Sequence, residues 1–283
     1  MTNNIPITRF APSPTGFLHL GHVASAMFSF NFSKERSGEM VLRIEDLDKS
    51  RCKEEYIQSI LDDLNWLGIN YRRTQNQSLR MKFYSIALEK LRSMDLIYPC
   101  WLTRKEIINA TSAPHNSSLF DTDLILDPSE MIRRRGKGLF PAWRLRIKNA
   151  IQYANQISED LFWVDEKLGK FKLDVEKFGD FIIARKDIST SYHLAVTLDD
   201  SFDGVTHVTR GSDLLETTNI HRLIQIILSL KQTKWVHHPL VLDKDGKRMA
   251  KRKFSKTIKN FREIGYKPSE VIDLALNAIK IVK

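Results

Sequence analysis

Residues 9–22 read RFAPSPTGFLHLGH, and the chain changes from strand to helix within them. The mixed run Ile5–Phe10 predicts a short strand, and residues 11–16 then break regular structure with two prolines and a glycine. From Gly21 onward, apolar residues recur at three- and four-residue spacing, which predicts a helix: Val23, Ala26, Met27 and Phe30. A loop between a strand and a helix N-terminus is where doubly wound sheets bind phosphate groups, because unpaired N–H groups and the helix dipole favour anions there.

The residues that follow continue the alternation of strand and helix. A buried strand is predicted at Met40–Ile44, and it ends in the acidic residues Glu45–Asp48. The apolar residues of Glu54–Leu67 share one helix face, with Gly68 as a C-terminal stop, and a further helix is predicted at about 79–94. This order and spacing predict an α/β fold with a doubly wound parallel sheet of the Rossmann type.

The second half of the chain is interrupted before the α/β pattern returns. Between about Tyr98 and Asp180 the sequence is rich in Ser, Thr, Asn and Pro, which predicts an insertion. Regular signals then return in Asp180–Arg185, Tyr192–Asp200, the helix Thr218–Leu230 and a last strand, Pro239–Leu242. We therefore expect four parts: the first half of the sheet domain in 1–97, an inserted subdomain in 98–180, the second half in 181–242, and a loop with a short helical tail in 243–283.

The composition is that of an ordinary globular protein. The chain has 283 residues, 42% of them hydrophobic and 28% charged, which excludes the disordered, collagen-like and disulfide-stapled classes. No apolar run approaches the roughly 18 residues of a membrane span, and the N-terminus lacks the layout of a signal peptide. We expect a soluble, cytoplasmic monomer. Two cysteines, Cys52 and Cys100, are too few for a disulfide framework or an all-cysteine zinc site.

The charge balance favours a polyanionic partner. The chain carries 44 Lys and Arg against 34 Asp and Glu, a formal net charge of +10. Each phosphate that is neutralised releases condensed counterions, so this balance favours a polyanion, but charge alone does not choose which one. Two clusters concentrate the excess, Arg133–Lys137 and Lys244–Lys259. Taken singly, each is more often a solvated surface run.

Two short motifs indicate nucleotide chemistry. His19 and His22 lie one turn apart at the predicted helix start, and Gly21 between them lets a base or a phosphate approach the backbone. Far downstream, Lys247–Arg252 follows the last predicted strand and the turn Asp243–Gly246. Lysines on such a loop can reach a pyrophosphate as negative charge builds up during nucleotidyl transfer. Taken alone, the first motif is more often an ordinary helix start with a glycine and two surface histidines.

Four ordered blocks of the sequence resemble class I aminoacyl-tRNA synthetases of the glutamyl branch. Residues 9–22 resemble that branch's form of the HIGH signature, and Arg248-Met249-Ala250-Lys251-Arg252 resembles the KMSKS loop. Residues 42–48 and 204–211 resemble two further blocks. The resemblance covers nearly the whole chain. It implies a ligase that activates glutamate with ATP, on a Rossmann-type fold with an inserted acceptor-type subdomain and a short helical C-terminal extension.

Within this branch, the layout resembles a paralogous subfamily that attaches glutamate to the queuosine base at the wobble position of tRNA(Asp). Glutamyl-tRNA synthetases carry a helical anticodon-binding region after the core, whereas this chain stops at Lys283, shortly after the KMSKS-like loop. Residues 210–214 and Val196 also resemble the paralogue more closely. The resemblance implies that the partner is the anticodon stem-loop of tRNA(Asp), received by the core along the two basic clusters.

Three features depart from that subfamily. Its zinc site often uses a Cys-x-Cys pair, but Cys100-Trp101-Leu102 keeps only the first cysteine, so we predict that zinc is absent. Ala250 replaces the serine of the KMSKS loop and Arg248 its first lysine. Residues 258–268 resemble the segment after that loop in ordinary glutamyl enzymes, which keeps open a truncated glutamyl-tRNA synthetase core charging a tRNA 3′ end. The altered loop leaves open a catalytically silent RNA-binding module.

The resemblance and the charges of glutamate assign the substrate site. By similarity it consists of Arg9, Ala11, Ser13, Glu45, Tyr192 and Arg210. The arginines, with the tyrosine, are expected to hold the side-chain carboxylate, and the glutamate the ammonium, since planar cationic donors and an acidic group match those charges. Taken one at a time, each residue also fits a structural role: a strand-end arginine, a helix-capping carboxylate, half of an ion pair or a core aromatic.

The ATP site follows from the same resemblance. It is expected to consist of His19, Gly21, His22, Arg248, Met249 and Lys251, of which His19, His22 and Lys251 are the expected catalytic residues. Magnesium is expected with the ATP, because the displaced pyrophosphate needs a counter-charge. The α-carboxylate of glutamate is itself the nucleophile, so no activated serine or cysteine is required.

Overall fold

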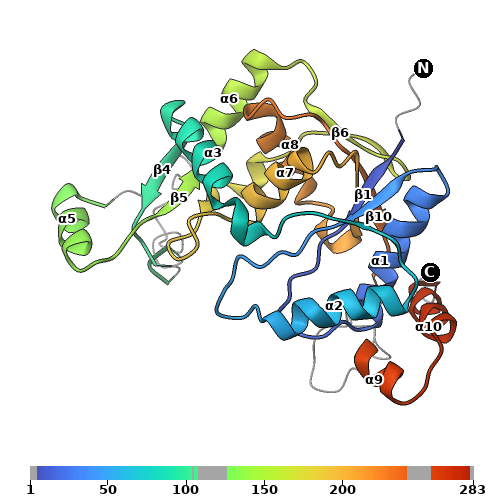
Figure 1. The fold of residues 1–283 in the computed structure, drawn as a ribbon. Helices are drawn as coiled ribbons and strands as arrows, with labels where there is room; N and C mark the ends of the chain where they lie inside the picture. Colours follow the sequence, from blue (N-terminus) through green and yellow to red (C-terminus); the bar gives the residue numbers. More distant parts are fainter. Residues whose placement is uncertain (1–4, 104, 108–125, 241–255, 281–283) are drawn as a thin grey trace.

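The main element of the fold is a sheet of parallel strands (Figure 1). The computed structural model describes residues 5–103, 105–107, 126–240 and 256–280. In spatial order, the strands are β3 (Arg72–Arg73), β2 (Glu39–Leu42), β1 (Ile7–Phe10), β9 (His207–Gly211), β10 (Lys234–His238), β6 (Phe162–Asp165) and β7 (Gly169–Lys172). The pairs are parallel except for β6 with β7, and the Thr206 N–H donates to the Ile7 carbonyl at 2.9 Å, which joins β1 to the β9 side. The predicted α/β fold with a parallel sheet is confirmed.

Packing on both faces buries the sheet. The α-helices are α1 (Leu20–Lys34), α2 (Glu54–Trp66), α3 (Met81–Ser93), α5 (Pro128–Gly136), α6 (Ile147–Ile157), α7 (Tyr192–Phe202), α8 (Thr218–Ile227), α9 (Ile258–Glu263) and α10 (Pro268–Lys280). Along β2, Met40 and Leu42 belong to the core shared with α1, α2 and α10, whereas Val41 packs on the opposite face with Trp163 and Val208. This two-sided burial is typical of parallel sheets. Among the described residues, none of the helices has both the length and the apolar character that a bilayer span requires.

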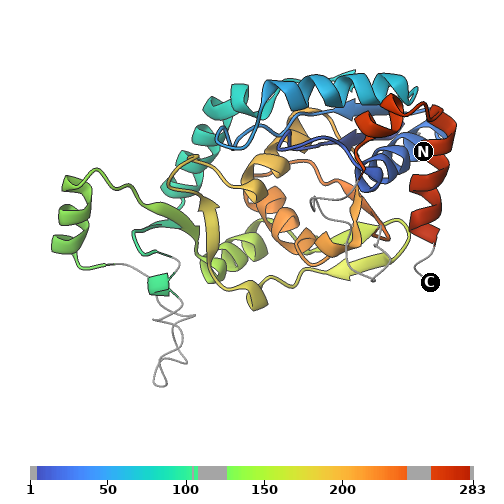
Figure 2. The ribbon, with the colours of Figure 1, turned by 90° about the horizontal axis from the view of Figure 1, so that it is seen from below.

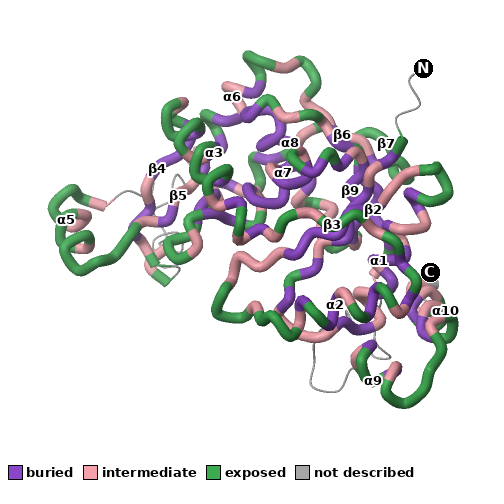
Figure 3. Tube along the Cα trace, in the orientation of Figure 1, coloured by how far each residue is buried: buried purple, intermediate pink, exposed green. Residues whose placement is uncertain are grey.

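A smaller antiparallel sheet stands beside the main one. It consists of β4 (Ile97–Cys100), β5 (Ala142–Leu145) and β8 (Phe181–Ala184), in that order. Helix α5 projects from this part away from the rest of the molecule (Figures 1 and 2), and none of its residues is buried (Figure 3). Strand pairing crosses the boundary expected at residue 180, because β6 precedes it yet pairs in the main sheet, and β8 follows it yet pairs in the small sheet.

Local signals in the sequence locate most helices. The helices predicted at 54–67, 79–94 and 218–230 are confirmed as α2, α3 and α8. α3 follows a 3-10 turn, η1 (Gln77–Arg80). The described ranges also contain the 3-10 turns η2 (Glu176–Phe178) and η3 (Ser212–Leu214). Gly68 follows α2 with φ of +70°, which glycine adopts without the steric cost of a Cβ.

The strand predicted at Pro239–Leu242 is wrong in its position. The strand is β10, and Pro239 and Leu240 follow it outside any strand, while residues 241 and 242 lie outside the described ranges. The end of the true strand does not look like a buried strand in the sequence, because His237 and His238 are polar residues. In the structure each of them is nevertheless only 5% exposed. Hydrogen bonds to Asp165 and to the Pro239 carbonyl satisfy these two rings, so hydropathy alone does not reveal their burial.

Buried charges connect β2 to helix α7. Arg43, which follows β2, is fully buried and lies 3.7 Å from Asp199, 2.8 Å from Asp200 and 3.0 Å from Asp203. Arg80 pairs with Asp199 at 2.9 Å and with Asp203 at 2.6 Å. Removing one partner from such a network leaves a buried charge without compensation, which is costly.

Arg80→Met is therefore expected to lower the free energy of unfolding by about 3 to 5 kcal/mol. Arg72→Met is the matched control, since its pair with Glu39 is exposed, with side chains 47% and 43% accessible. The control is expected to lose less than about 1 kcal/mol. Urea unfolding of the two variants measures the difference, and equal losses would show that burial of the network does not govern its contribution.

Candidate active site

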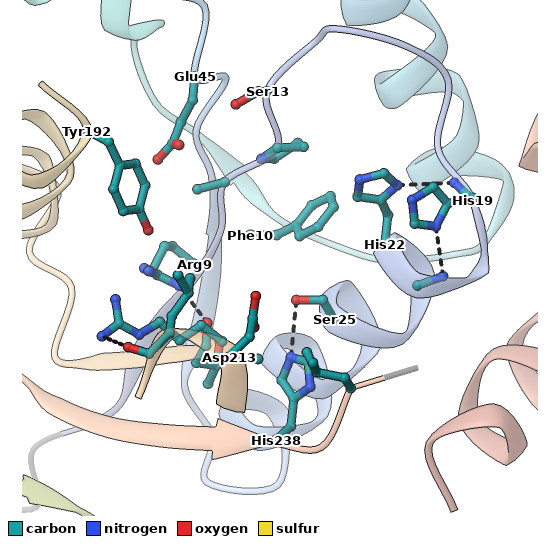
Figure 4. A pocket seen from close by; sticks show the side chains of 18 residues that line it. Arg9, Phe10, Ser13, His19, His22, Ser25, Glu45, Tyr192, Asp213 and His238 are labelled. Atoms are coloured by element: carbon teal, nitrogen blue, oxygen red, sulfur yellow. Dashed lines mark hydrogen bonds between the residues drawn. The ribbon is translucent and has the colours of Figure 1, made fainter. Parts of the chain in front are cut away.

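A cavity of about 470 Å³ opens where β1 and β9 end and α1 begins (Figure 4). It is lined by Arg9, Phe10, Ala11, Pro12, Ser13, His19, Gly21, His22, Ser25, Glu45, Tyr192, Thr209, Arg210, Gly211, Asp213, Leu214, His238 and Leu240. Every predicted site residue that falls in the described ranges is in this lining. Figure 4 places Arg9, Glu45 and Tyr192 at one end of the cavity and His19 and His22 at the other.

The two histidines cap the N-terminus of α1. The Gly21 N–H donates to His19 Nδ1 at 3.1 Å, and the His19 N–H donates to His22 Nδ1 at 3.2 Å. The two ring centroids are 3.8 Å apart, and the first turn of α1 contains no acidic residue. Both rings are thereby held at the positive end of the helix dipole, a position that favours an anion such as a phosphate group.

Arg9 is buried rather than placed at a surface end of its strand. It is 6% exposed, and its Nε lies 3.3 Å from Asp200 Oδ1. Its Nη1 donates to the Thr209 carbonyl at 2.6 Å. A guanidinium carries five N–H donors, so these contacts leave donors for a group bound in the cavity.

Arg210 is held by neutral acceptors. Its guanidinium donates to His237 Nε2 at 3.2 Å, His221 Nδ1 at 2.9 Å, Thr218 Oγ1 at 2.6 Å and the Leu214 carbonyl at 3.1 Å. Burial lowers the pKa of Arg210 to about 10, because desolvation disfavours its charged form. The residue stays cationic at neutral pH and, within the described part of the chain, is not half of an ion pair.

Glu45 faces the arginines across the cavity. Its side chain is 9% accessible, and its Oε1 lies 3.4 Å from an Nη of Arg43. Burial raises the pKa of Glu45 to about 7, although the charges of Arg43 and Arg9 act in the opposite direction. Tyr192, at the start of α7, is 41% exposed and is therefore not a core aromatic. This end of the cavity offers two cations and one titratable acid to a ligand.

Sequence reasoning missed four polar residues of the lining: Ser25, Thr209, Asp213 and His238. Ser25 Oγ and His238 Nε2 lie 3.3 Å apart and join α1 to the end of β10. The helical pattern counted only apolar positions of α1, so it did not single out the serine. The misplaced last strand concealed the histidine, whereas Thr209 and Asp213 lie inside stretches that the resemblance had already marked.

The KMSKS-like segment, residues 248–252, lies outside the described residues, so the roles expected for it stay predictions. The described residues on either side both reach the site. Leu240 lines the cavity, and after the gap Thr257 forms an antiparallel bridge with His19. The Ile258 N–H also donates to the Leu18 carbonyl at 2.9 Å. The C-terminal flank of the segment is therefore attached at the helix-capping end of the cavity, and the N-terminal flank lines the cavity.

The described part of the chain holds no group of three His, Cys, Asp or Glu side chains suited to a metal ion. Cys100 is buried, Cys52 is partly buried, and both are free thiols. The predicted absence of zinc stays a prediction, because several candidate ligands, including His115, lie outside the described residues. Magnesium is held mainly by substrate phosphates and water in such sites, which needs no cluster of protein carboxylates.

The charges of the cavity match a particular pair of ligands. Guanidiniums suit a carboxylate, the partly ionised Glu45 suits an ammonium, and the capped N-terminus of α1 suits phosphates. An acidic amino acid beside a nucleotide carries this set of charges.

Comparisons with known proteins identify the family of the chain. Residues 7–278 match the family described as tRNA synthetases class I (E and Q), catalytic domain. Glutamyl-Q tRNA(Asp) synthetase of Rhodobacter capsulatus is 38% identical over 271 residues, which cover 94% of this chain and 98% of that protein. Glutamate–tRNA ligase of Aquifex aeolicus is 34% identical over 272 residues, covering 94% of this chain but only 55% of the ligase. The chain thus spans about half the length of that ligase.

The fold is also found among solved structures. The crystal structure of a glutamate tRNA ligase from Elizabethkingia meningosepticum, in complex with its amino acid, superposes with a TM-score of 0.76 at 24% identity. The match covers 96% of this chain and 60% of that chain, and at this identity it supports the fold alone. Because the family match extends over nearly all of the sequence, the chain belongs to the class I tRNA synthetases of the glutamate and glutamine type.

Proposed function

We propose that this protein activates L-glutamate with ATP and transfers the glutamyl group to the queuosine base of tRNA(Asp). The observation that carries the proposal is the cavity in which two arginines, a titratable glutamate and the capped start of α1 face one another. The relative named glutamyl-Q tRNA(Asp) synthetase supports it, since the identity of 38% extends over 98% of that protein. ATP, glutamate and tRNA meet in the cytoplasm, where we place the reaction.

Glutamate binds at the end of the cavity that contains the arginines. Arg9 and Arg210, with the Tyr192 hydroxyl, hold the side-chain carboxylate, and Glu45 pairs with the ammonium. Each charge-assisted hydrogen bond of this kind contributes roughly 1.5 to 3 kcal/mol. Ala11 and Ser13, which line the same stretch of the cavity, complete the substrate site.

ATP binds at the other end. Its site consists of Gly21, His19, His22, Arg248, Met249 and Lys251. An α-carboxylate oxygen of glutamate attacks the α-phosphorus, the bond from phosphorus to the bridging oxygen breaks, and pyrophosphate leaves with the negative charge. His19, His22 and Lys251 act where that charge accumulates, which lowers the barrier more than it tightens ground-state binding. Magnesium bound to the phosphates supplies further counter-charge.

Helix α5 provides a surface for the RNA. Arg133 and Arg134 are engaged with Glu130, and Arg134 also with Glu106. The remaining two cations of this run, Arg135 and Lys137, are exposed and form no ion pair within the described part of the chain. These two side chains are placed to contact phosphates of the anticodon stem-loop.

A stem-loop experiment tests the acceptor. An isolated queuosine-bearing anticodon stem-loop of tRNA(Asp) is expected to accept radiolabelled glutamate, because the proposed acceptor is the wobble base. With full-length tRNA, charging is expected to survive periodate oxidation of the 3′-terminal ribose. Unmodified tRNA(Asp) is the matched control and is expected to remain uncharged.

The outcome also separates the two rival functions. If periodate oxidation abolishes charging, the protein is a glutamyl-tRNA synthetase core. The 34% identity to a glutamate–tRNA ligase supports this alternative. A protein that binds the stem-loop but never exchanges pyrophosphate into ATP with glutamate would be the silent RNA-binding module.

The role of α5 can be measured through salt dependence. Replacing both Arg135 and Lys137 by alanine is expected to weaken stem-loop binding and to reduce the slope of log affinity against log salt by about 1 to 2, since each phosphate contact releases counterions. Lys172→Ala, on exposed β7, is the control and is expected to leave that slope unchanged. Filter binding at several salt concentrations gives both slopes. Equal slopes in all three proteins would remove α5 from the RNA site.

The pKa of Glu45 predicts a pH dependence of glutamate binding. With its pKa at about 7 in the free protein, the carboxyl is protonated below pH 7 and cannot pair with an ammonium. Affinity for glutamate, measured by calorimetry, is expected to rise as the pH increases from 6 to 8. Glu45→Gln is expected to bind weakly and without this dependence, and an unchanged pH profile in that variant would exclude Glu45 as the ammonium site.

The same shift predicts a change in stability. Because the folded-state pKa lies above the value of 4.5 for an unperturbed glutamate, the fold favours the protonated form. That contribution is fully present below pH 4.5 and is lost as the pH rises through 7. At pH 8, the free energy of unfolding of Glu45→Gln, measured by urea titration, is therefore expected to exceed that of the parent by about 3 kcal/mol at most. At pH 4, the two proteins are expected to have similar free energies of unfolding.

A further inference from the structure

The two arginines of the cavity are held in different ways. Arg9 has a carboxylate partner, Asp200, at 3.3 Å. Arg210 lies deeper in a cage of neutral groups, and in the described ranges no carboxylate comes within 4 Å of its guanidinium. Among its acceptors are two histidine rings, His221 and His237, each buried to about 95%.

The hydrogen bonds fix the protonation of these rings. A guanidinium only donates, so His221 Nδ1 and His237 Nε2 must present lone pairs to Arg210. His221 then carries its proton on Nε2 and donates to His193 Nδ1 at 3.0 Å. His237 carries its proton on Nδ1 and donates to Asp165 Oδ2 at 2.7 Å.

Both rings remain neutral at physiological pH. Burial and the charge of Arg210 lower the pKa of His237 to about 4 and that of His221 well below its usual range. Neither ring therefore offsets or adds to the charge of the guanidinium. The position of Arg210 is fixed, yet no carboxylate in the described ranges forms an ion pair with its guanidinium.

We propose that His221 and His237 are positioning residues that hold Arg210 with neutral acceptors, so that its charge is left for the side-chain carboxylate of the substrate and the site selects glutamate over glutamine. The inference rests on the proposed function and deepens it. A buried cation without a counter-ion is costly, and a substrate carboxylate removes that cost when it binds. The neutral side-chain amide of glutamine cannot offset the desolvation cost of Arg210. The neutral acceptors around Arg210 therefore make this cost a source of discrimination between the two amino acids.

A pair of isosteric variants isolates the charge. Asparagine and aspartate both place an oxygen near the position of His221 Nδ1, and both lose the contact with His193. His221→Asn keeps a neutral acceptor on Arg210, whereas His221→Asp places an anion there. Calorimetric titration of each variant with L-glutamate and with L-glutamine measures the ratio of the two affinities, and thermal unfolding confirms that both variants are folded.

His221→Asn is expected to retain the preference for glutamate. His221→Asp is expected to bind glutamate at least tenfold more weakly than His221→Asn, with glutamine affinity changed less than about threefold, since only the substrate carboxylate competes with the new anion. If His221→Asp does not fold, Thr218→Asn and Thr218→Asp repeat the comparison at the hydroxyl 2.6 Å from the guanidinium. An equal glutamate-to-glutamine ratio in the asparagine and aspartate variants would overturn the proposal.

Glutamate binding and catalysis are measured separately, so that failure of the proposed function can be distinguished from failure of this inference. A parent protein that binds glutamate but fails to exchange pyrophosphate or to glutamylate RNA would refute the proposed function and leave the role of the cage standing. A parent protein that does not prefer glutamate to glutamine in binding would refute the cage.

Discussion

Arg43 and its carboxylate partners determine how the cavity is built. The residue follows β2 directly, is fully buried, and is bonded to Asp200 of α7. Asp200 in turn pairs with Arg9 of β1, and Arg43 also lies 3.4 Å from Glu45. Through this network, the arginine end of the cavity, the acid opposite it and the helix that begins with Tyr192 are held as one unit. A change in any member therefore alters both the fold and the site.

The sequence is informative where chemistry and local conformation coincide. The turn from strand to helix in residues 9–22, with its glycine between two histidines, predicts a phosphate site, and the structure places the helix N-terminus and both rings in one cavity. The same holds for helix α2, whose end at Gly68 is readable because a positive φ favours glycine. These features depend on neighbours in the sequence, which a pattern can detect.

Features that depend on distant partners were not predictable. His221 and His237 read as polar positions, and only the fold places both beside Arg210 and shows that each ring is neutral. Strands β6 and β8 are each only four residues long, so nothing local assigns one to the main sheet and the other to the small one. The burial of Arg9 follows likewise from Asp200, which is 191 positions away in the sequence. Resemblance to a family supplied the list of site residues, but not the bonds that hold them.

The packing of α10 against α1 has a consequence for how the chain reaches this structure. One hydrophobic core contains Phe10, Val23 and Leu42 together with Val271 and Ala275. The helix whose N-terminus forms the phosphate end of the cavity is therefore covered by a helix that the ribosome synthesises long after α1. Contacts of such high sequence separation form late and slowly. Until α10 has been synthesised, the nascent chain exposes an apolar face of α1, which makes this face a place for chaperones to bind during synthesis.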